Sequence, residues 1–419
     1  MELKNKYQYT YFVYPYVIDE TKYEKYILKL FRDKKCEFRI FQKEKDFDMY
    51  SYFLPQVRTS FFPTFELRDE KLKEFEHFRK DKKAKIVAKQ NCACFSYYLD
   101  KDIEGNVDNG SGIFFNIEKI DIICFKTGIC FFAMKTLLNP ESNFTELLDF
   151  NYKFRDINTE FLSLKNFENI KIKTDIFEDV SDIAELISKL TGANKNQSSL
   201  TKELSNSQFY TYSYSCIERD YWNERNSFQN LENEFYKYAN VLPSNYASDF
   251  NKANIEHNLY ILDSLKYTRT GVTKLSSNII CSGIDTYNFT KLPYEYENQY
   301  FYTYILSLYQ KIFLKKMNLE FKDYKKISTL REKFISFTKV FWEQEITLND
   351  NGNLYYRALK RVMELDDIYD EVKRKYEVIY KDLNIERNNV YYSVIMVLLV
   401  ISLIFNCINI TVLLLSNSW

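Results

Sequence analysis

The sequence is poor in the residues that carry metal and imidazole chemistry. Its 419 residues include only two His, and its eight Cys contain no CxxC pair. This composition argues against a zinc cage and leaves little for histidine-based acid–base catalysis. We interpret the cysteines as reduced, small hydrophobic side chains, buried in a body that lies in a reducing compartment.

Recognisable catalytic motifs are also lacking. No phosphate-binding loop, GxGxxG, GxSxG or HExxH pattern occurs. The formal net charge is +0 at pH 7, so no overall field attracts nucleic acid. We therefore predict no catalytic residues, no metal centre, no direct contact with nucleic acid and no enzyme. An enzyme with an unrecognised carboxylate site in the N-terminal domain is the weakest of three hypotheses.

Charge is missing altogether from one long stretch near the C-terminus. Residues 390–415 read VYYSVIMVLLVISLIFNCINITVLLL. Because ~20 apolar residues span the hydrocarbon core, this stretch predicts one transmembrane helix and makes lipid a partner. Basic residues lie just before the stretch, and no basic residue follows it. Those before it are Lys373, Arg374, Lys375, Lys381 and Arg387. The positive-inside rule then predicts a single-pass protein of the plasma membrane, with a cytoplasmic body and the C-terminus outside.

Upstream patterns predict an α+β fold. Aromatic and β-branched runs indicate strands in an N-terminal α/β domain, 1–190, including a hairpin that turns at Lys126-Thr127-Gly128. The polar stretch 191–208 predicts a linker or mobile loop. Region 209–352 is predicted as a helical region. Its first part, 209–292, has a mixed pattern, and the scarcity of Pro and Gly after Pro293 favours long helices in the rest. The segment 104–112, EGNVDNGSG, predicts an exposed loop.

A heptad pattern follows in 353–389, which predicts a stalk helix continuous with the transmembrane helix. Its apolar positions are separated alternately by four and three residues: Ala358, Val362, Leu365, Tyr369, Val372, Tyr376, Ile379 and Leu383. Such a seam packs on another helix. We favour the same helix of another subunit, which makes the protein a homo-oligomer; the alternative is a helix at 328–346 of the same chain.

Two amide side chains interrupt the apolar run. Asn406 and Asn409 are three residues apart and therefore share one helix face. An amide in hydrocarbon requires a partner or water. The pair either lines a pore in an oligomer or forms hydrogen bonds that hold helices together.

This layout of α/β domain, helical middle and stalk helix entering the membrane resembles the CorA family of divalent-cation channels. The runs KIDIICFKTGICFFAMK at 119–135, LLDFNYKFRDI at 147–157 and the stretch 352–408 are similar to the divergent CorA-like proteins found beside type III CRISPR systems. The resemblance implies a pentamer, a divalent cation as the transported ion, a small nucleotide as the gating ligand and a role in antiviral defence.

The sequence departs from that family where its Gly-Met-Asn signature is expected. The corresponding place reads Phe405-Asn406-Cys407-Ile408-Asn409, so only an asparagine is left of the signature. The family's second membrane helix has no counterpart in the remaining apolar residues, 410–415. We therefore expect no magnesium selectivity. The leading hypothesis is an oligomeric membrane channel with a ligand-sensing body, and the alternative is a membrane-anchored interaction or scaffold protein that does not conduct ions.

Overall fold

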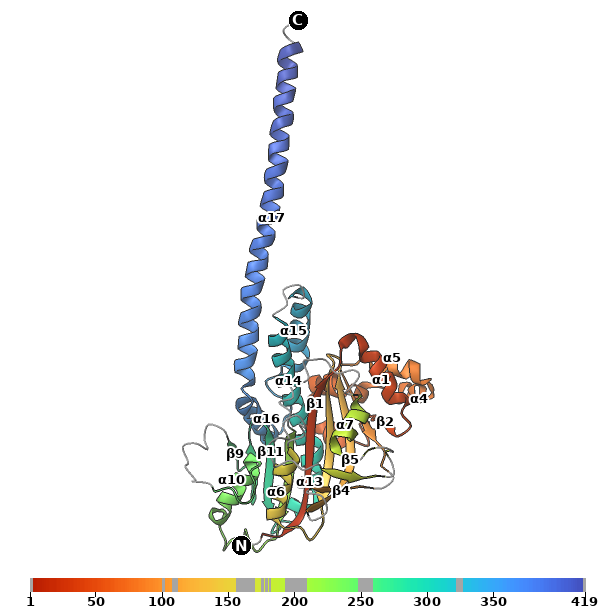
Figure 1. Ribbon diagram of the computed structural model, residues 1–419, viewed down its shortest axis with the longest axis vertical. Coiled ribbons are helices and arrows are strands. Elements are labelled where there is room, and N and C mark those ends of the chain that lie inside the picture. The colour runs from red at the N-terminus through yellow and green to blue at the C-terminus, as the bar shows by residue number, and fades with distance from the viewer. Residues whose placement is uncertain are drawn as a thin grey trace.

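The computed structural model describes most of the chain. The described residues are 3–99, 102–107, 112–155, 170–174, 177, 180, 182–192, 209–247, 259–321 and 327–416. They form a mixed α/β body from which one long helix projects (Figure 1).

A single mixed sheet runs through the body. Its main path is β2-β3-β5-β6-β1-β8-β11-β10-β9, and β4 and β7 extend it beside β5. β8 and β11 pair in parallel, whereas the other named pairings are antiparallel. The strands are β1 (Asn5–Val17), β2 (Cys36–Phe38), β3 (Cys92–Tyr97), β4 (Ile103–Val107), β5 (Ile113–Phe125), β6 (Ile129–Leu138), β7 (Lys171–Lys173), β8 (Tyr210–Ile217), β9 (Tyr260–Leu262), β10 (Thr268–Val272) and β11 (Ser276–Ser282).

Helices cover both faces of the sheet. Successive side chains of a strand point to opposite faces, so Tyr9 and Tyr11 of β1 enter one core while Phe12 and Tyr16 enter the other. The first core is closed by α2 (Phe47–Tyr52), α3 (Pro55–Phe61), α14 (Phe301–Glu320), α15 (Ile327–Phe341) and α16 (Asp350–Val362). The second is closed by α1 (Tyr23–Arg32), α4 (Asp69–His77), α5 (Lys80–Val87), α6 (Phe144–Arg155), α7 (Ile183–Thr191) and α10 (Glu232–Asn240).

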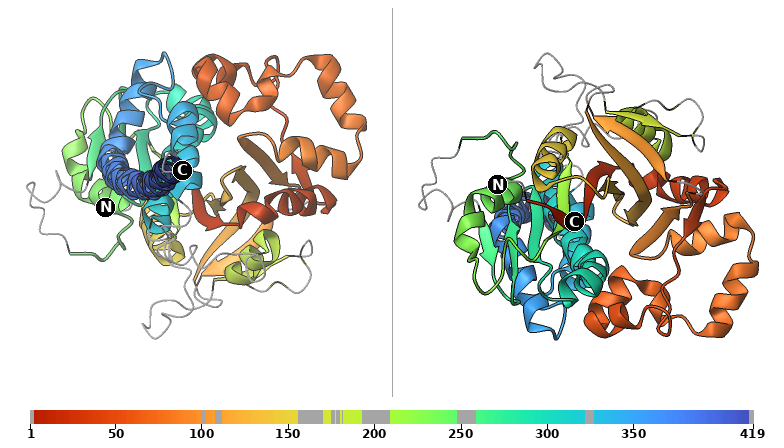
Figure 2. Two further views of the ribbon diagram at one scale, coloured as in Figure 1. Left: turned by 90° about the horizontal axis from the view of Figure 1, so that it is seen from above. Right: turned by 90° about the horizontal axis from the view of Figure 1, so that it is seen from below.

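Short helical turns complete the body. They are η1 (Glu20–Lys22), η2 (Pro63–Glu66), η4 (Phe228–Leu231), α12 (Tyr287–Thr290), α13 (Leu292–Glu295) and the π-helical turn η5 (Tyr296–Tyr300). η5 leads directly into α14, which is buried along most of its length. Figure 2 shows that α4 and α5 lie at the far end of the body from α17 (Leu365–Ser416).

The predicted hairpin is confirmed, but the predicted loop at 104–112 is partly wrong. β5 and β6 turn at Gly128, whose φ of 78° suits glycine. Residues 103–107 form β4 rather than a loop. Gly105 allows this strand to pair with β5, because a Cβ there would lie 2.1 Å from the ring of Phe115. A glycine that indicates a turn in the sequence thus marks a close approach.

The sheet also crosses the predicted domain boundary. β1 pairs with β6 on one side and with β8 on the other, so residues of 1–190 and of 209–352 share one sheet. The prediction of a helical region at 209–352 is therefore wrong for β8 to β11. β8 reads YTYSYSCI and is buried along its whole length, where the hydroxyl of Ser213 bonds to that of Thr10 and the hydroxyl of Ser215 donates to Asn5. Most of the predicted linker, 191–208, lies outside the described residues.

The predicted stalk, 353–389, is not one helix. α16 ends at Val362 and α17 begins at Leu365, with Glu364 between them at a φ of 56°. The heptad spacing continues across this break, so the pattern alone did not reveal it. From Leu365 the chain is one helix of 52 residues to Ser416, which confirms the long C-terminal helix. Within the described ranges, no helix is long and apolar enough to cross a membrane.

Candidate ligand cavity at the base of the long helix

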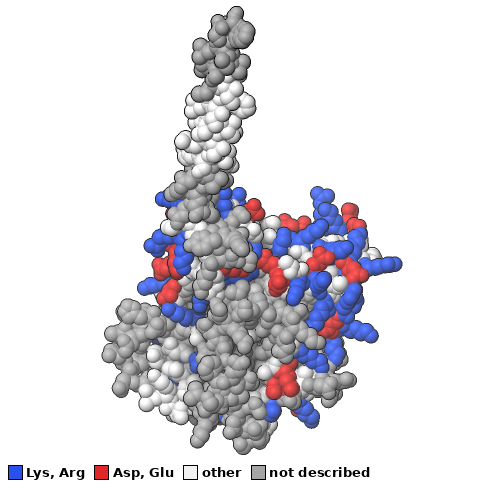
Figure 3. All heavy atoms as spheres, turned by 45° about the horizontal axis from the view of Figure 1, so that its top comes forward, with Lys and Arg blue, Asp and Glu red and all other residues white. Residues whose placement is uncertain are grey.

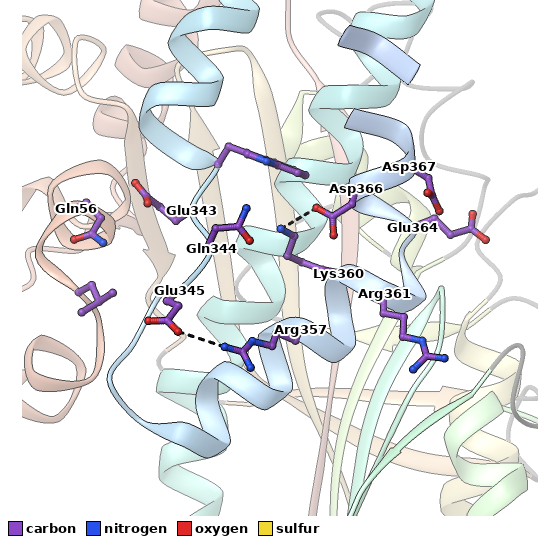
Figure 4. A pocket seen from close by; sticks show the side chains of 12 residues that line it. Gln56, Glu343, Gln344, Glu345, Arg357, Lys360, Arg361, Glu364, Asp366 and Asp367 are labelled. Carbon is purple, nitrogen blue, oxygen red and sulfur yellow. Dashed lines mark hydrogen bonds and ion pairs between the residues drawn. The ribbon is translucent and has the colours of Figure 1, made fainter. Parts of the chain in front are cut away.

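A cavity lies where α17 leaves the body (Figure 4). Its volume is about 810 Å³, which is within the range of small-molecule sites. The wall is built from the start of α3, the segment that follows α15, the end of α16 and the first turn of α17. Residues far apart in the sequence therefore meet at the helix that projects from the body.

The α16–α17 junction forms one side of this cavity. Glu364 has a φ of 56° and so lies in the left-handed region. This conformation raises the free energy of a non-glycine residue by about 1 kcal/mol. The Glu364 carboxylate accepts a hydrogen bond from Lys274 Nζ at 2.7 Å, and its backbone carbonyl starts α17 by accepting from the Ile368 amide. Both side chains of the Lys274–Glu364 pair are about half exposed, so this contact to the β10–β11 turn contributes at most ~1 kcal/mol to the change of helix direction.

Ion pairs link the parts of the wall. Lys360 of α16 pairs with Asp366 of α17 at 3.0 Å, across the junction. Arg357 pairs with Glu345 at 3.3 Å, but both side chains are more than half exposed, so this pair contributes at most ~1 kcal/mol. Because Lys360 is buried and also lies 4.5 Å above the ring of Trp342, it holds α16, α17 and the segment after α15 together.

Trp342 connects the cavity wall to the second turn of α17. Its ring stacks on Tyr369, with centroids 4.3 Å apart and an interplanar angle of 11°. Tyr369 also packs against Phe334 and shares a hydrogen bond with Thr338, both in α15. A ligand that moves Trp342 would therefore disturb the packing of α17.

A buried lysine of α14 contacts the β10–β11 turn, which in turn contacts the α16–α17 junction. Lys311 of α14 donates to the backbone carbonyl of Lys274 at 2.9 Å, and its ammonium lies over the ring of Tyr210. Burial, with smaller contributions from Lys315 and Lys274, lowers the pKa of Lys311 to about 7, although Glu364 opposes the shift. The lysine that positions the Lys274 turn therefore exchanges its proton near pH 7 in the folded protein.

Lys311→Met is expected to raise the free energy of unfolding by about 3 kcal/mol at pH 7 and to change it little near pH 10.5. Between pH ~7 and ~10.4 the unfolded lysine holds a proton that the folded one has lost. Native stability therefore falls as the pH drops through this window, and methionine removes the penalty. Urea unfolding at both pH values measures the difference.

The exposed lysine of α15, Lys339, provides the matched control for that experiment. Lys339→Met should leave the free energy of unfolding nearly the same at both pH values. An equal gain for Lys311→Met at pH 7 and pH 10.5 would contradict the titration of Lys311, because loss of packing or of the Lys274 hydrogen bond does not depend on pH in this range.

The predicted heptad seam packs against the same chain as far as the structure describes it. Leu365 and Val372 are fully buried in the core shared with α14 and α15, and Tyr369, Tyr376 and Ile379 pack against that core. The other positions are distributed as follows: Ala358 is buried and Val362 half-buried in α16, and the side chain of Leu383 lies outside the described residues. This is the intrachain alternative, with α14 joining the predicted helix at 328–346. Homo-oligomerisation stays a prediction.

The outer part of α17 differs sharply from its base. Figure 3 shows charged side chains crowded around the base, whereas the described outer part has none. Large apolar side chains are exposed there, including Leu398 and Phe405. Asn406 and Asn409 lie in the same part and are also exposed. The structure thus places both predicted amides on α17, far from the cavity.

The sequence did not predict a cluster of buried charged side chains on the sheet. Glu297 of η5 accepts hydrogen bonds from Lys135 at 2.8 Å and from the hydroxyl of Tyr11 at 2.7 Å. Lys119 pairs with Asp121 at 3.1 Å on β5, next to a break in the strand register between Ile117 and Lys119. The charged residues Lys119, Asp121 and Lys135 within the apolar strands β5 and β6 are the signal that could have indicated this cluster. No pattern in the sequence indicates that Glu297 lies next to them.

The chemistry of this cluster is structural rather than that of a poised acid or base. Burial alone would raise the pKa of Glu297, but Lys135 and Lys119 outweigh it and hold that pKa below its ordinary value of 4.5. The carboxylate in turn raises the pKa of Lys135 against the effect of burial. Both groups stay charged at neutral pH, so neither is tuned for proton transfer.

Comparison with known proteins adds no assignment: no family model, curated protein or solved structure matches this chain. No group of three or more His, Cys, Asp and Glu that could hold a metal ion occurs among the described residues. The cavity and the helix that starts in it therefore carry the functional argument.

Proposed function

We propose that this protein is a membrane-anchored ligand sensor in which the cavity acts on α17. One observation carries the proposal: α17 contributes Asp366 and Asp367 to the cavity wall in its first turn and then continues unbroken to Ser416. A ligand in the cavity would contact the first turn of the helix that reaches the apolar run. Because a helix is stiff, a tilt at its base moves its far end.

The exposed apolar side chains of α17 support the anchor. The described residues between 391 and 408 include large apolar side chains that are about half or more exposed, such as Ile395, Leu399 and Phe405. Full burial of an exposed side chain of this kind is favourable by ~1.5–3 kcal/mol, so each half-exposed side chain gains about half of that when it leaves water, and an uncovered patch of this size is unfavourable. Lipid would cover it. The basic residues that precede the run support a body on the cytoplasmic side of the plasma membrane.

The junction supports the coupling. Glu364 holds a left-handed conformation, and Lys360 bridges α16 to α17 through Asp366. A ligand that binds more tightly to one orientation of α17 increases the population of that orientation. The ratio of its affinities for the two orientations limits the size of the shift. The cavity wall lies on both sides of the junction, which is the arrangement that such a difference requires.

An ion channel is the second candidate, favoured by Asn406 and Asn409 on one face of α17. In a homo-oligomer, a pentamer by the CorA resemblance, these amides would line a pore. This version keeps a divalent cation as the transported ion, a small nucleotide as the gating ligand and a role in antiviral defence. If the amides only hold helices together, the protein is an anchored scaffold that does not conduct.

The anchor is tested by flotation with lipid vesicles. We expect the full chain to float with the vesicles and a chain that ends at residue 389 to stay in the bottom fraction, because the truncation removes the apolar run and leaves the described body intact. Equal distribution of the two chains would refute membrane anchoring by α17.

The channel version is tested by ion flux into vesicles that contain the purified protein. Asn406→Leu and Asn409→Leu are each expected to change the flux at least tenfold, because they remove the amide from the pore wall. Ile404→Leu, an apolar exchange two residues away, is the matched control and should change little. Absence of flux in the unaltered protein under every ligand would leave the anchored scaffold.

A further inference from the structure

We propose that the cavity at the base of α17 binds a linear polyamine, a flexible aliphatic chain with two or more ammonium groups. The inference rests on the proposed function in one respect, because it names the ligand class of the same sensing cavity. Three observations support it: the net charge of the wall, the presence of carboxylates without an ion-pair partner among the described residues, and the size of the cavity.

The cationic side chains of the wall are engaged. The lining contains five carboxylates and three cationic side chains. Arg357 and Lys360 each pair with a carboxylate of the same wall, Glu345 and Asp366 respectively. The guanidinium of Arg361 lies over the ring of Tyr260, which is not part of the lining. The cavity is thus negative overall, and its positive charges face partners that they already have.

Two carboxylates of the wall are left for a ligand. Neither Glu343 nor Asp367 has an ion pair with any residue that the structure describes. Burial raises the pKa of Glu343, as expected for a carboxyl without a nearby cation. Figure 4 shows the two on opposite sides of the cavity, one from the segment after α15 and the other from α17. Two separated negative charges match a ligand with two separated positive charges.

Other small ligands fit this wall less well. The phosphates of a nucleotide would meet an acidic wall and would have to displace Glu345 or Asp366 from its cation. A single metal ion would leave most of the ~810 Å³ unfilled, and the described residues hold no metal-binding group. In contrast, the apolar surfaces of Trp342 and Leu54 can cover methylene groups, and the amide of Gln344 can accept N–H hydrogen bonds.

A bound polyamine would act on the junction. By reaching from Glu343 to Asp367 it would tie the segment after α15 to the first turn of α17. This tie would add to the Lys360–Asp366 pair, which already joins α16 to the same turn of α17. The ligand would therefore favour the orientation of α17 in which the separation of the two carboxylates matches that of its ammonium groups, and raise the population of that orientation.

The test is calorimetric titration of the full chain in detergent with spermine at low ionic strength. We expect saturable binding, and we expect Glu343→Gln combined with Asp367→Asn to weaken it at least tenfold. The matched control combines Asp69→Asn with Glu74→Gln, two exposed carboxylates of α4, and should stay within twofold of the unaltered protein. Glu343→Lys, which supplies its own ammonium group, is the second variant and should abolish binding.

The outcomes separate this inference from the proposed function. Absent or unsaturable spermine binding, or equal weakening in the control pair, would overturn it. Binding of ATP that Arg357→Gln weakens, or binding of a basic peptide without binding of spermine, would overturn the polyamine and keep the cavity as the sensing site. If the full chain binds spermine as expected but does not float with vesicles, the membrane anchor is wrong and this inference stands.

Discussion

Leu365→Lys combined with Val372→Lys is expected to release the base of α17 from the body. Both side chains are fully buried in the core that α17 shares with α14 and α15. Removing each apolar side chain costs ~2–3 kcal/mol, and burying an unpaired ammonium costs several more. Detachment of the helix is the cheaper response, because both ammonium groups then reach water while the sheet stays packed.

Limited proteolysis measures this release. The segment after α15, which includes Trp342, should be cut at least tenfold faster in the double variant, because its stacking on Tyr369 is lost. Val378→Lys is the matched control, since Val378 lies on the same helix and is 60% exposed. It should be cut at the rate of the unaltered protein.

The same variant separates the two interpretations of the heptad seam. If the seam holds subunits together, the double variant should lose oligomeric mass in detergent and keep its protection from protease. If the seam packs within the chain, the double variant should lose its protection from protease before it loses any oligomeric mass. A particle that loses mass with unchanged proteolysis would contradict the intrachain packing described above.

Glu297→Gln is expected to lower the free energy of unfolding by about 3 kcal/mol at pH 7. The substitution leaves Lys135, whose side chain is only 8% exposed, without its buried partner, and Glu118 alone remains to pair with it. It also weakens the acceptor for the hydroxyl of Tyr11. Removal of one member of a buried pair costs more than the pair contributes, because the other charge stays buried.

The pH dependence identifies the cause. The pKa of Glu297 is lowered in the folded protein, so its contribution is complete above its ordinary value of 4.5 and is lost as the pH falls through the folded value. Glu297→Gln should therefore destabilise the protein less at pH 3 than at pH 7. Glu141→Gln, at an exposed carboxylate, should have little effect at either pH. Equal losses at both pH values for Glu297→Gln would refute the ion pair as the cause.

The sequence by itself determined the features that depend on neighbouring residues. The β5–β6 turn follows from Gly128, which alone adopts a φ of 78° without strain. The 52-residue α17 follows from a stretch without Gly or Pro, and its uncharged outer part follows from composition alone. These signals act over a few residues, so they survive whatever the rest of the chain does.

Tertiary structure alone decided what covers each apolar face and which distant charges meet. The heptad seam states that one side of α17 is apolar, but α14 and α15 occupy it as far as Ile379. β8 pairs with β1 about two hundred residues earlier, and this pairing merges two predicted units into one sheet. Glu297 meets Lys135, and Glu343 and Asp367 face one cavity, through the same long-range packing. Such contacts depend on how whole elements stack, and no local period in the sequence encodes the stacking.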